Sequence, residues 1–318
     1  MDYDLIIIGG GPAGAGAGVY AARKRLKSLL IAKEFGGQST ASTDIQNWIG
    51  TVSISGSELA SNFKKHLEAY KDSILDIQEG EVVIGIEARE NLTASGVAQA
   101  GGFAVKTDKN ITYTGKTVLI TAGSTRRKLT VPGAAEYEHK GITYCASCDG
   151  PLFSGRDVVV IGGGNAGFET AAQLLAYTKS VTLLTTGETF PADPVTIEKV
   201  LTNSKMKALN NIEVLEVKGD KMVTTIIYKD KKTGEQVELP TGGIFVEVGQ
   251  IPATEFAKGV VEMDKWDHIV IDPRTQKTNV PGIWAAGDCT DGLYHQNNIA
   301  AGDAIRAVED IYLALTAK

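Results

Sequence analysis

Residues 4–14 read Asp4-Leu5-Ile6-Ile7-Ile8-Gly9-Gly10-Gly11-Pro12-Ala13-Gly14, an uninterrupted apolar run that leads into a glycine-rich turn. An apolar run without alternation is typical of a strand that is buried on both faces of a parallel sheet. Gly9, Gly11 and Gly14 have the G-x-G-x-x-G spacing. In that motif the first glycine makes a tight turn, the second lets the backbone approach a pyrophosphate, and the third lets helix and strand pack closely. The stretch predicts the first strand, turn and helix of a dinucleotide-binding domain.

The residues after this turn complete the same unit. A helix rich in alanine is predicted over residues 15–27, and a second buried strand over residues 28–32. Glu34 then stands about 20 residues beyond the glycines, where such domains use an acid to hold a ribose hydroxyl. Strand, turn, helix and acid together are a far more specific signal than the glycine spacing alone.

A second stretch repeats the pattern. Residues 157–161 form another apolar run, followed by Gly162-Gly163-Gly164-Asn165-Ala166-Gly167 and a predicted helix. The next strand, 181–184, ends in Thr185 and Thr186, where neither an acid for a 2′-hydroxyl nor an arginine for a 2′-phosphate is present. The chain therefore carries two dinucleotide-binding halves in sequence, and the second lacks the residues that choose the nucleotide.

A cysteine pair lies just before the second unit, where residues 144–150 read Tyr144-Cys145-Ala146-Ser147-Cys148-Asp149-Gly150. Two thiols separated by two residues can close a small disulfide ring at the start of a helical turn, where backbone N–H groups favour the thiolate. Asp149 can then carry the protons that thiol–disulfide exchange requires. The alternatives are two structural cysteines or half of a zinc site, for which Cys289 and His139 would have to be recruited singly. The pattern favours a redox pair over a metal site.

Composition limits the function classes. The chain has 318 residues and a formal net charge of −6, which argues against a general nucleic-acid-binding protein. Its longest apolar runs have the length of strands, well short of the roughly 18 residues that a membrane span needs. The start of the chain has no basic region before its apolar run, so we expect no secretion signal and a cytoplasmic location. In that reducing compartment a Cys-x-x-Cys pair is more often catalytic or metal-binding than structural.

The remaining segments supply further strands and a final helix. Residues 81–120 alternate like antiparallel strands, and residues 243–249 and 282–289 are predicted as buried strands. Asp288 stands at the end of the last strand, ahead of a helix over residues 299–315. An aspartate there can hold ribityl hydroxyls while helix N–H groups stabilise negative charge on a flavin. A role as an N-cap or turn residue is the alternative.

Together these motifs resemble those of the low-molecular-weight thioredoxin reductase family, whose members are FAD-dependent disulfide reductases. The resemblance covers nearly the whole chain and is carried by residues 9–14, 36–38, 145–150, 162–167 and 286–289, with Gln296 beyond them. It implies an α/β fold of two Rossmann-like, three-layer dinucleotide-binding domains, the second inserted in the first.

The resemblance also implies where the domains lie. An FAD-binding domain would comprise residues 1–125 and 250–318, and a pyridine-nucleotide-type domain with the cysteine pair would comprise residues 126–249. The linkers at about 124–127 and 248–252 would be hinges between two domain orientations.

The family's site residues can be carried over where this sequence matches its motifs. By that resemblance Cys148 faces the flavin, Cys145 attacks the disulfide of the partner protein, and Asp149 is the general acid and base; no metal is implied. The implied FAD-binding residues are Gly9, Gly11, Pro12, Ala13, Gly14, Glu34, Gly37, Gln38, Asn47, Gly287, Asp288, His295, Gln296 and Asn297. The residues of a degraded nucleotide site are Gly162, Gly164, Asn165, Ala166, Gly167, Thr185 and Thr186.

The implied partner is thioredoxin or a thioredoxin-like protein, and the implied assembly is a homodimer. The electron donor is a separate question, because NADPH-using members carry arginines where this chain has residues 185–187 and Pro191, and NADH-using relatives place a glutamate at the position of Thr185. Other members draw electrons from ferredoxin. The pattern favours a donor other than NADPH, ferredoxin among them, with basic residues 23–27 or 126–128 as docking candidates.

Several alternatives stay open. NADH or NADPH can be held by the intact second turn despite the atypical residues around it. A thioredoxin-reductase-like ferredoxin–NADP reductase needs no cysteine pair, so Cys145 and Cys148 argue against it. A non-enzymatic redox sensor that merely retains FAD is the third alternative.

Overall fold

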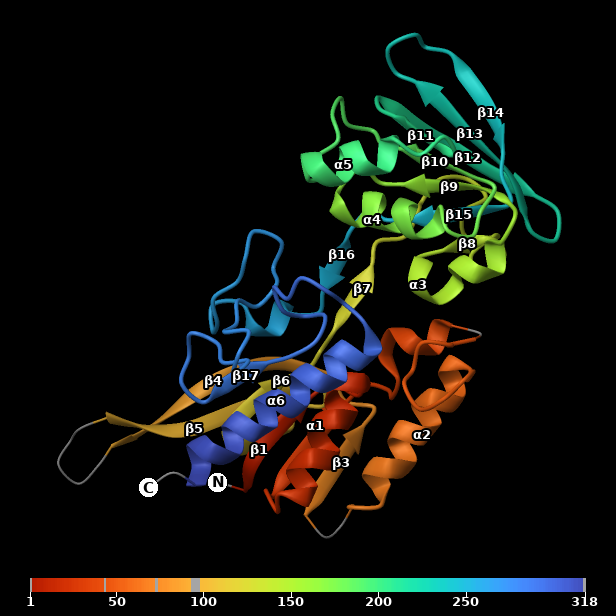
Figure 1. Cartoon of the computed structure of the whole chain (residues 1–318). Helices are drawn as coiled ribbons and strands as arrows, with labels where there is room; N and C mark the ends of the chain where they lie inside the picture. Colours follow the sequence, from red (N-terminus) through yellow and green to blue (C-terminus); the bar gives the residue numbers. More distant parts are fainter. Residues whose placement is uncertain (1, 43, 72–73, 93–97, 317–318) are drawn as a thin grey trace. The chain divides into compact units, whose positions relative to one another are not determined.

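The computed structural model describes residues 2–42, 44–71, 74–92 and 98–316. The chain divides into two compact units, one of Met1–Thr125 with Ile251–Lys318 and one of Arg126–Gln250 (Figure 1). The second unit is thus inserted in the sequence of the first. The chain returns to the first unit after Gln250, one residue later than the sequence predicts.

The first unit is built on a seven-stranded sheet. Its strand order is β3-β2-β1-β6-β5-β4, with β17 also paired to β6. The strands β3, β2, β1, β6 and β17 pair in parallel, whereas β6, β5 and β4 form an antiparallel meander. In chain order the strands are β1 (Tyr3–Ile8), β2 (Ser28–Ala32), β3 (Leu75–Glu79), β4 (Val83–Leu92), β5 (Ala98–Thr107), β6 (Thr112–Ile120) and β17 (Ile283–Ala285).

The apolar run that opens the sequence forms β1, inside this sheet. Leu5 and Ile7 pack against the helices α1, α2 and α6. Of these three helices, α1 and α6 lie side by side (Figure 1). Ile6 and Ile8 pack on the opposite face, against residues of β4, β5 and the segment 256–271. The run does not alternate because both faces of the strand are buried. The helices are α1 (Pro12–Arg23), α2 (Gly56–Glu68) and α6 (Asn297–Thr316), and a 3-10 helix, η1, spans Gly37–Ala41.

The second unit has the same three-layer plan. Its five-stranded sheet is parallel, in the order β11-β10-β9-β15-β8. Val158, Val160 and Phe245 pack against helices on one face, whereas Val159 and Ile244 pack against a separate three-stranded antiparallel sheet, β12-β13-β14, on the other. The predicted α/β class with two Rossmann-like halves is confirmed.

The bounds of the second unit's elements follow chain order. The parallel strands are β8 (Ile142–Thr143), β9 (Asp157–Ile161), β10 (Ser180–Leu184), β11 (Met206–Leu209) and β15 (Gly243–Val246). The antiparallel strands are β12 (Ile212–Gly219), β13 (Val223–Asp230) and β14 (Gln236–Pro240). The helices are α3 (Ala146–Asp149), α4 (Asn165–Leu174) and α5 (Pro194–Leu201), with a 3-10 helix, η2, at Gly150–Phe153.

Some elements differ from the sequence prediction. Helix α1 begins at Pro12 rather than at residue 15, because proline suits the first turn of a helix, where its missing N–H would have no partner. Among the elements that were not predicted are β3, β11 and α5. Strand β3 reads LDIQE and is mostly half-buried, so it shows little apolar pattern. Helix α5 has eight residues and is marked mainly by its cap, in which Asp193 accepts from two backbone N–H groups.

The two connections between the units pair with each other. Strands β7 (Ser124–Arg126) and β16 (Gln250–Pro252) form a two-stranded sheet, and the predicted hinge ranges fall on them. Among the described residues, the longest helices are too short or too polar to cross a membrane.

Candidate active site

The first glycine turn joins β1 to α1 and has the shape that its motif requires. Gly9 has a φ of +126°, and a Cβ built there would lie 2.2 Å from the carbonyl oxygen of Thr121. A Cβ at Gly14 would lie 1.9 Å from the carbonyl oxygen of Gly9, because helix and strand pack this closely. At Gly11 no described atom comes within 4 Å of such a Cβ, so this glycine faces open space. A ligand's phosphates can therefore approach the backbone at Gly11.

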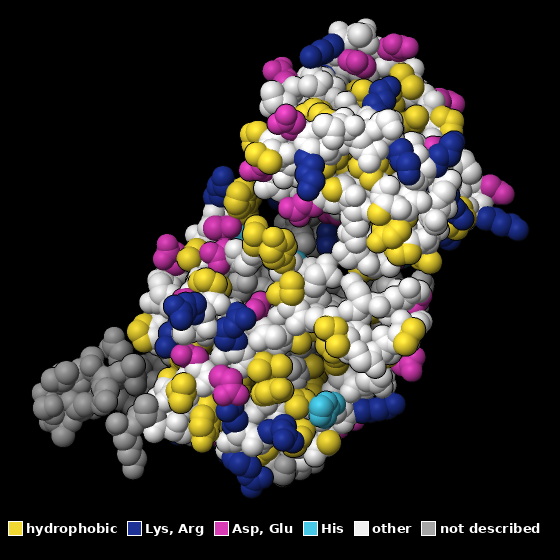
Figure 2. Space-filling view, in the orientation of Figure 1, with side chains coloured by type: hydrophobic (Ala, Val, Ile, Leu, Met, Phe, Trp, Pro, Cys, Tyr) yellow, Lys and Arg dark blue, Asp and Glu magenta, His cyan; other side chains and the backbone are white. Residues whose placement is uncertain are grey.

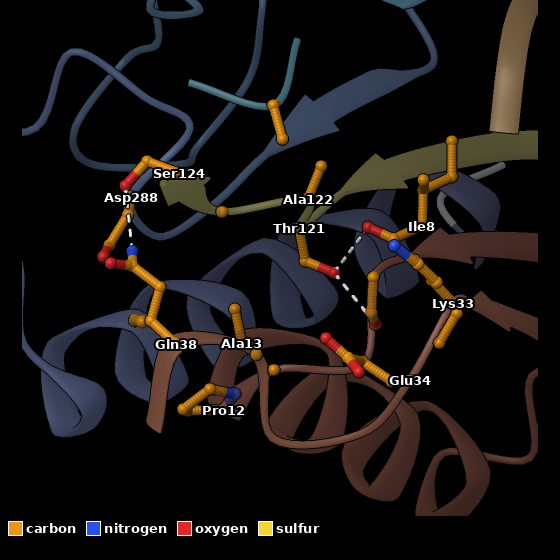
Figure 3. A pocket seen from close by; sticks show the side chains of 18 of the residues that line it. Ile8, Pro12, Ala13, Lys33, Glu34, Gln38, Thr121, Ala122, Ser124 and Asp288 are labelled. Carbon is orange, nitrogen blue, oxygen red and sulfur yellow. Dashed lines mark hydrogen bonds between the residues drawn. The ribbon is translucent and has the colours of Figure 1, made fainter. Parts of the chain in front are cut away.

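A cavity of about 470 Å³ opens beside this turn (Figure 3). Glu34 reaches it from the end of β2 and Asp288 from the end of β17, while Gln38 donates to Ser124 Oγ at 3.1 Å. The predicted cofactor-binding residues that line the cavity are Gly9, Gly11, Pro12, Ala13, Glu34, Gly37, Gln38, Asp288 and Asn297. Residues from both ends of the sequence therefore meet at one sheet edge.

Five predicted cofactor-binding residues lie outside this lining. Gly14 packs the helix against the turn, and Gly287, with a φ of +78°, packs against α6, where its Cβ would lie 3.2 Å from Ala300 Cβ. The other three are Asn47, Gln296 and His295: Asn47 Nδ2 donates to Gln296 Oε1 at 3.2 Å, and the ring of His295 lies 6.2 Å from that of His268.

Three polar side chains at this edge were not predicted from the sequence. Thr121 donates to the carbonyl oxygen of Ile8 at 2.9 Å, Ser124 accepts from Gln38, and Ser39 donates to Asn297 Oδ1 at 3.1 Å. Thr121 and Ser124 follow the carboxyl end of β6, the strand beside β1. Ligands bind at that end of the strands in such sheets, and this is the signal that could have found them.

The cysteine pair forms a disulfide at the start of α3. Cys145 is the N-cap of this one-turn helix, and its Sγ accepts a hydrogen bond from the backbone N–H of Cys148 at 3.1 Å. Both residues are partly exposed. Over the described ranges, His, Cys, Asp and Glu form no group of three or more that could hold a metal ion. The geometry is that of a disulfide within reach of solvent.

Asp149, the residue after the pair, is held on the same helical turn. Its Oδ2 accepts a hydrogen bond from the hydroxyl of Thr143, and the same hydroxyl accepts from the backbone N–H of Cys145 at 3.4 Å. Thr143 is 7% exposed, at the end of β8. The structure thus brings together all three residues predicted to be catalytic, with a threonine that the sequence did not single out.

The second glycine turn joins β9 to α4 and reproduces the first. Gly162 has a φ of +131°, and a Cβ at Gly167 would lie 2.0 Å from the carbonyl oxygen of Gly162. At Gly164 the space around a Cβ is open to 4 Å within the described chain. Asn165 Oδ1 accepts from the backbone N–H of Asp193 at 2.7 Å. The second turn therefore has the shape that holds a phosphate in dinucleotide-binding domains.

Two threonines, Thr185 and Thr186, follow β10 beside this second turn, where the sequence predicts the residues that would select a nucleotide. Thr185 is buried against Gly163, whose Cβ would lie 2.7 Å from that of Thr185. Lys231 reaches Thr186 from the turn after β13, with Nζ 2.5 Å from the Thr186 carbonyl oxygen and 3.2 Å from its hydroxyl. No arginine occupies residues 185–187. A lysine that is remote in sequence stands at this edge instead.

A model of the pyridine nucleotide-disulphide oxidoreductase family matches residues 3–304. The chain belongs to this family. One component of the alkyl hydroperoxide reductase of Escherichia coli (strain K12) is 36% identical over 306 residues, which are 96% of this chain and 57% of that protein. A Bacillus subtilis (strain 168) protein named NADH dehydrogenase is 35% identical over 305 residues, again 96% of this chain and 57% of that protein. The chain thus spans little more than half the length of these curated relatives.

Solved structures of thioredoxin reductases resemble this oxidoreductase over its whole length. The enzyme from Giardia duodenalis has a TM-score of 0.88 and 32% identity, covering 98% of this chain and 99% of that one. The enzyme from T. acidophilum has a TM-score of 0.64 and 38% identity, covering 99% of both chains. The predicted family is confirmed: the chain is a member of this flavoprotein disulfide oxidoreductase family with the fold of the thioredoxin reductases, and FAD is its cofactor.

The cavity in the first unit of this oxidoreductase fits FAD. Its glycine turn leaves the backbone open at Gly11 at the start of α1, where helix N–H groups favour a pyrophosphate. The carboxylates of Glu34 and Asp288 reach the same cavity and can accept from ribose and ribityl hydroxyls.

An ion pair with a buried carboxylate lies beside the second turn of this oxidoreductase. Glu247 follows β15, and its side chain is 6% exposed; Oε2 accepts from Arg126 at 3.1 Å and Oε1 from the Thr170 hydroxyl at 2.8 Å. Burial raises the pKa of Glu247, while Arg126 and Thr170 act in the opposite direction. Glu247 was not singled out from the sequence. The signal that could have found it is an acid directly after a buried strand, at the sheet edge that holds the glycine turn.

The third cysteine supports a prediction on thiol reactivity. Cys289 is fully buried, and this burial raises the pKa of its thiol to about 11. We expect 5,5′-dithiobis(2-nitrobenzoate) at pH 8 to find no reactive thiol in the native oxidised enzyme and two after anaerobic reduction. Cys289 should react only after denaturation, because about one in a thousand of its thiols is ionised at that pH. Reaction of Cys289 in the native state, detected by peptide mapping, would contradict this.

Proposed function

We propose that the protein is an FAD-dependent reductase of a protein disulfide, of thioredoxin or a thioredoxin-like protein, that acts through Cys145 and Cys148. The observation that carries the proposal is a partly exposed disulfide held on one helical turn with the carboxylate of Asp149. The thioredoxin reductases among its structural neighbours support the choice of partner.

The cofactor supplies an electron pair that reduces the disulfide. We propose that the backbone at Gly11 and the start of α1 hold its pyrophosphate, Glu34 a ribose hydroxyl and Asp288 the ribityl chain. The other predicted contacts, Asn47, His295 and Gln296 among them, remain predictions.

The reduced pair exchanges with the partner in two balanced steps. The Cys145 thiolate attacks one sulfur of the partner's disulfide, forming a mixed disulfide and releasing the first partner thiolate, which takes a proton. Asp149 then accepts the proton of Cys148, whose thiolate attacks Cys145, closes the ring and releases the second partner thiolate to be protonated. The hydrogen bond from the Cys148 N–H to Cys145 Sγ supports this assignment, since a donor at that sulfur favours its thiolate.

We propose further that the electron donor is not NADPH. No arginine stands at residues 185–187, and the ammonium of Lys231 is already bonded to Thr186. The intact second turn, and the relative named NADH dehydrogenase, favour NADH among nucleotides. Ferredoxin is the other donor that we propose.

Ferredoxin would need a basic docking surface, and the candidate clusters are partly neutralised. Lys24 pairs with Glu309 at 2.8 Å, Lys128 with Glu138 at 2.8 Å, and Arg126 with the buried Glu247. On the face in Figure 2, basic and acidic side chains are interspersed. Ferredoxin therefore stands as a proposal that the donor assay decides.

In that assay the oxidised holoenzyme is mixed anaerobically with NADPH, NADH or reduced ferredoxin, and flavin absorbance is followed. We expect NADPH to bleach the flavin at least about tenfold more slowly than the better of the other two, because a charged 2′-phosphate is left without its usual partners. Rapid stoichiometric bleaching by NADPH would overturn this. If the wild type is bleached rapidly by NADPH and the Lys231→Ala variant is not, then Lys231 recognises the 2′-phosphate.

The cytoplasmic location and the homodimer stay predictions. Analytical ultracentrifugation of the holoenzyme tests the second, and a mass of about 67 kDa, twice that of the 33.7 kDa chain, is expected.

A further inference from the structure

The hydroxyl of Thr143 is hydrogen-bonded to both the Asp149 carboxylate and the backbone of Cys145. It is the last residue of β8, where it pairs with Phe245 of β15, and it is 7% exposed. Its hydroxyl donates to Asp149 Oδ2 and accepts from the backbone N–H of Cys145 at 3.4 Å. A side chain fixed in the sheet thus bonds both the carboxylate and the first cysteine of the pair.

The direction of these hydrogen bonds follows from chemistry. A hydroxyl has one proton to give, and the N–H of Cys145 can only donate, so the proton of Thr143 goes to the carboxylate. A hydrogen bond given to a carboxylate favours its ionised form. In that form Asp149 can accept a proton from a thiol.

We propose that Thr143 is a positioning residue for disulfide exchange: its hydroxyl orients the Asp149 carboxylate relative to Cys145 and Cys148 and keeps it ready to accept a proton. This rests on the proposed function. In the step concerned, the Cys148 thiol gives its proton to Asp149, and the new thiolate attacks Cys145 of the mixed disulfide. The bond between Cys145 and the partner breaks, and the leaving thiolate takes the proton from Asp149.

The test compares three variants of the holoenzyme. Thr143→Val removes the hydroxyl but keeps the branched shape that suits a strand, whereas Thr143→Ser keeps the hydroxyl. Thr241→Val is the matched control, because Thr241 lies in the same unit and is 5% exposed. Like that of Thr143, its hydroxyl both donates and accepts: it donates to the carbonyl oxygen of Gly243 at 2.8 Å and accepts from the N–H of Gly243. Each variant is reduced anaerobically, and its exchange with oxidised thioredoxin and with 5,5′-dithiobis(2-nitrobenzoate) is followed from pH 5 to 9.

We expect Thr143→Val to slow exchange with thioredoxin roughly tenfold to a hundredfold at saturating partner, with KM within about twofold. Its rate profile with both disulfides should shift toward higher pH, because the ionised carboxylate loses a donor. Thr143→Ser should recover most of the rate and the wild-type profile, and Thr241→Val should match the wild type.

Two results overturn the proposal: a Thr143→Val variant with the wild-type rate and profile, or a loss that Thr143→Ser does not rescue, since the methyl group rather than the hydroxyl would then matter. If the wild type reacts with the small disulfide but not with thioredoxin, the proposed partner is wrong. The comparison on the small disulfide still decides the role of Thr143.

Discussion

Replacing Cys148 with serine should lower turnover of thioredoxin by the holoenzyme by at least roughly a thousandfold while FAD stays bound. A serine hydroxyl cannot form the ring with Cys145, so the mixed disulfide has no internal route to resolve. FAD should stay because the cavity assigned to it lies wholly in the first unit. The measurement is steady-state reduction of thioredoxin, with flavin content read from the visible spectrum.

The matched control is Ser147→Ala, which alters the residue beside Cys148 on the same helical turn. Ser147 is exposed and donates to Gln173 Oε1 at 3.1 Å, so we expect turnover within about twofold of the wild type. If Cys148→Ser keeps more than a tenth of wild-type turnover, the cysteine pair is not the route. A ferredoxin–NADP reductase or a redox sensor would then be the better account.

Replacing Gly9 with alanine should abolish FAD binding and destabilise the first unit by at least about 3 kcal/mol. The residue has a φ of +126°, which L side chains rarely adopt, and the new Cβ would lie 2.2 Å from the Thr121 carbonyl oxygen. The Cβ is fixed to the backbone at Gly9, and the oxygen belongs to the backbone of Thr121. These residues directly follow β1 and β6, which are neighbours inside the sheet, so the clash cannot be relieved without disturbing one of the two strands. Flavin content and thermal unfolding of the purified variant measure the two effects.

Gly302→Ala is the control for this change. Gly302 is exposed within α6, and within the described structure an added Cβ would meet no atom closer than 4 Å. The variant should bind FAD normally and gain up to about 1 kcal/mol, because alanine is the better helix former. A Gly9→Ala protein with full FAD and unchanged unfolding temperature would show that the turn does not shape the site.

The two dinucleotide turns could be predicted because their signals are local. Each combines a run of four apolar residues with glycines at fixed spacing, and the same few residues make the strand, the turn and the helix start. The cysteine pair and Asp149 are likewise within five residues of one another. The local geometry of the two turns and of the cysteine pair can therefore be predicted from the sequence.

The rest depended on contacts between residues remote in sequence. Lys231 is hydrogen-bonded to Thr186, and Arg126 is paired with Glu247, but each pair is brought together only by the fold of the second unit. Thr143 lies close to Cys145 in sequence, but a threonine at the end of a short strand gives no sign of which way its hydroxyl bonds. Helix α5 was missed because it is short, and β3 because its residues are mostly half-buried and polar.

In the proposed function, electrons leave the flavin through the cysteine pair to a protein disulfide. The most direct measurement is flavin absorbance after oxidised thioredoxin is added anaerobically to the dithionite-reduced holoenzyme and to its Cys145→Ser variant. We expect recovery of the oxidised flavin spectrum in the wild type, in proportion to the thioredoxin added, and no recovery in the variant. Flavin that stays reduced in the wild type, or that reoxidises equally fast in Cys145→Ser, would contradict it.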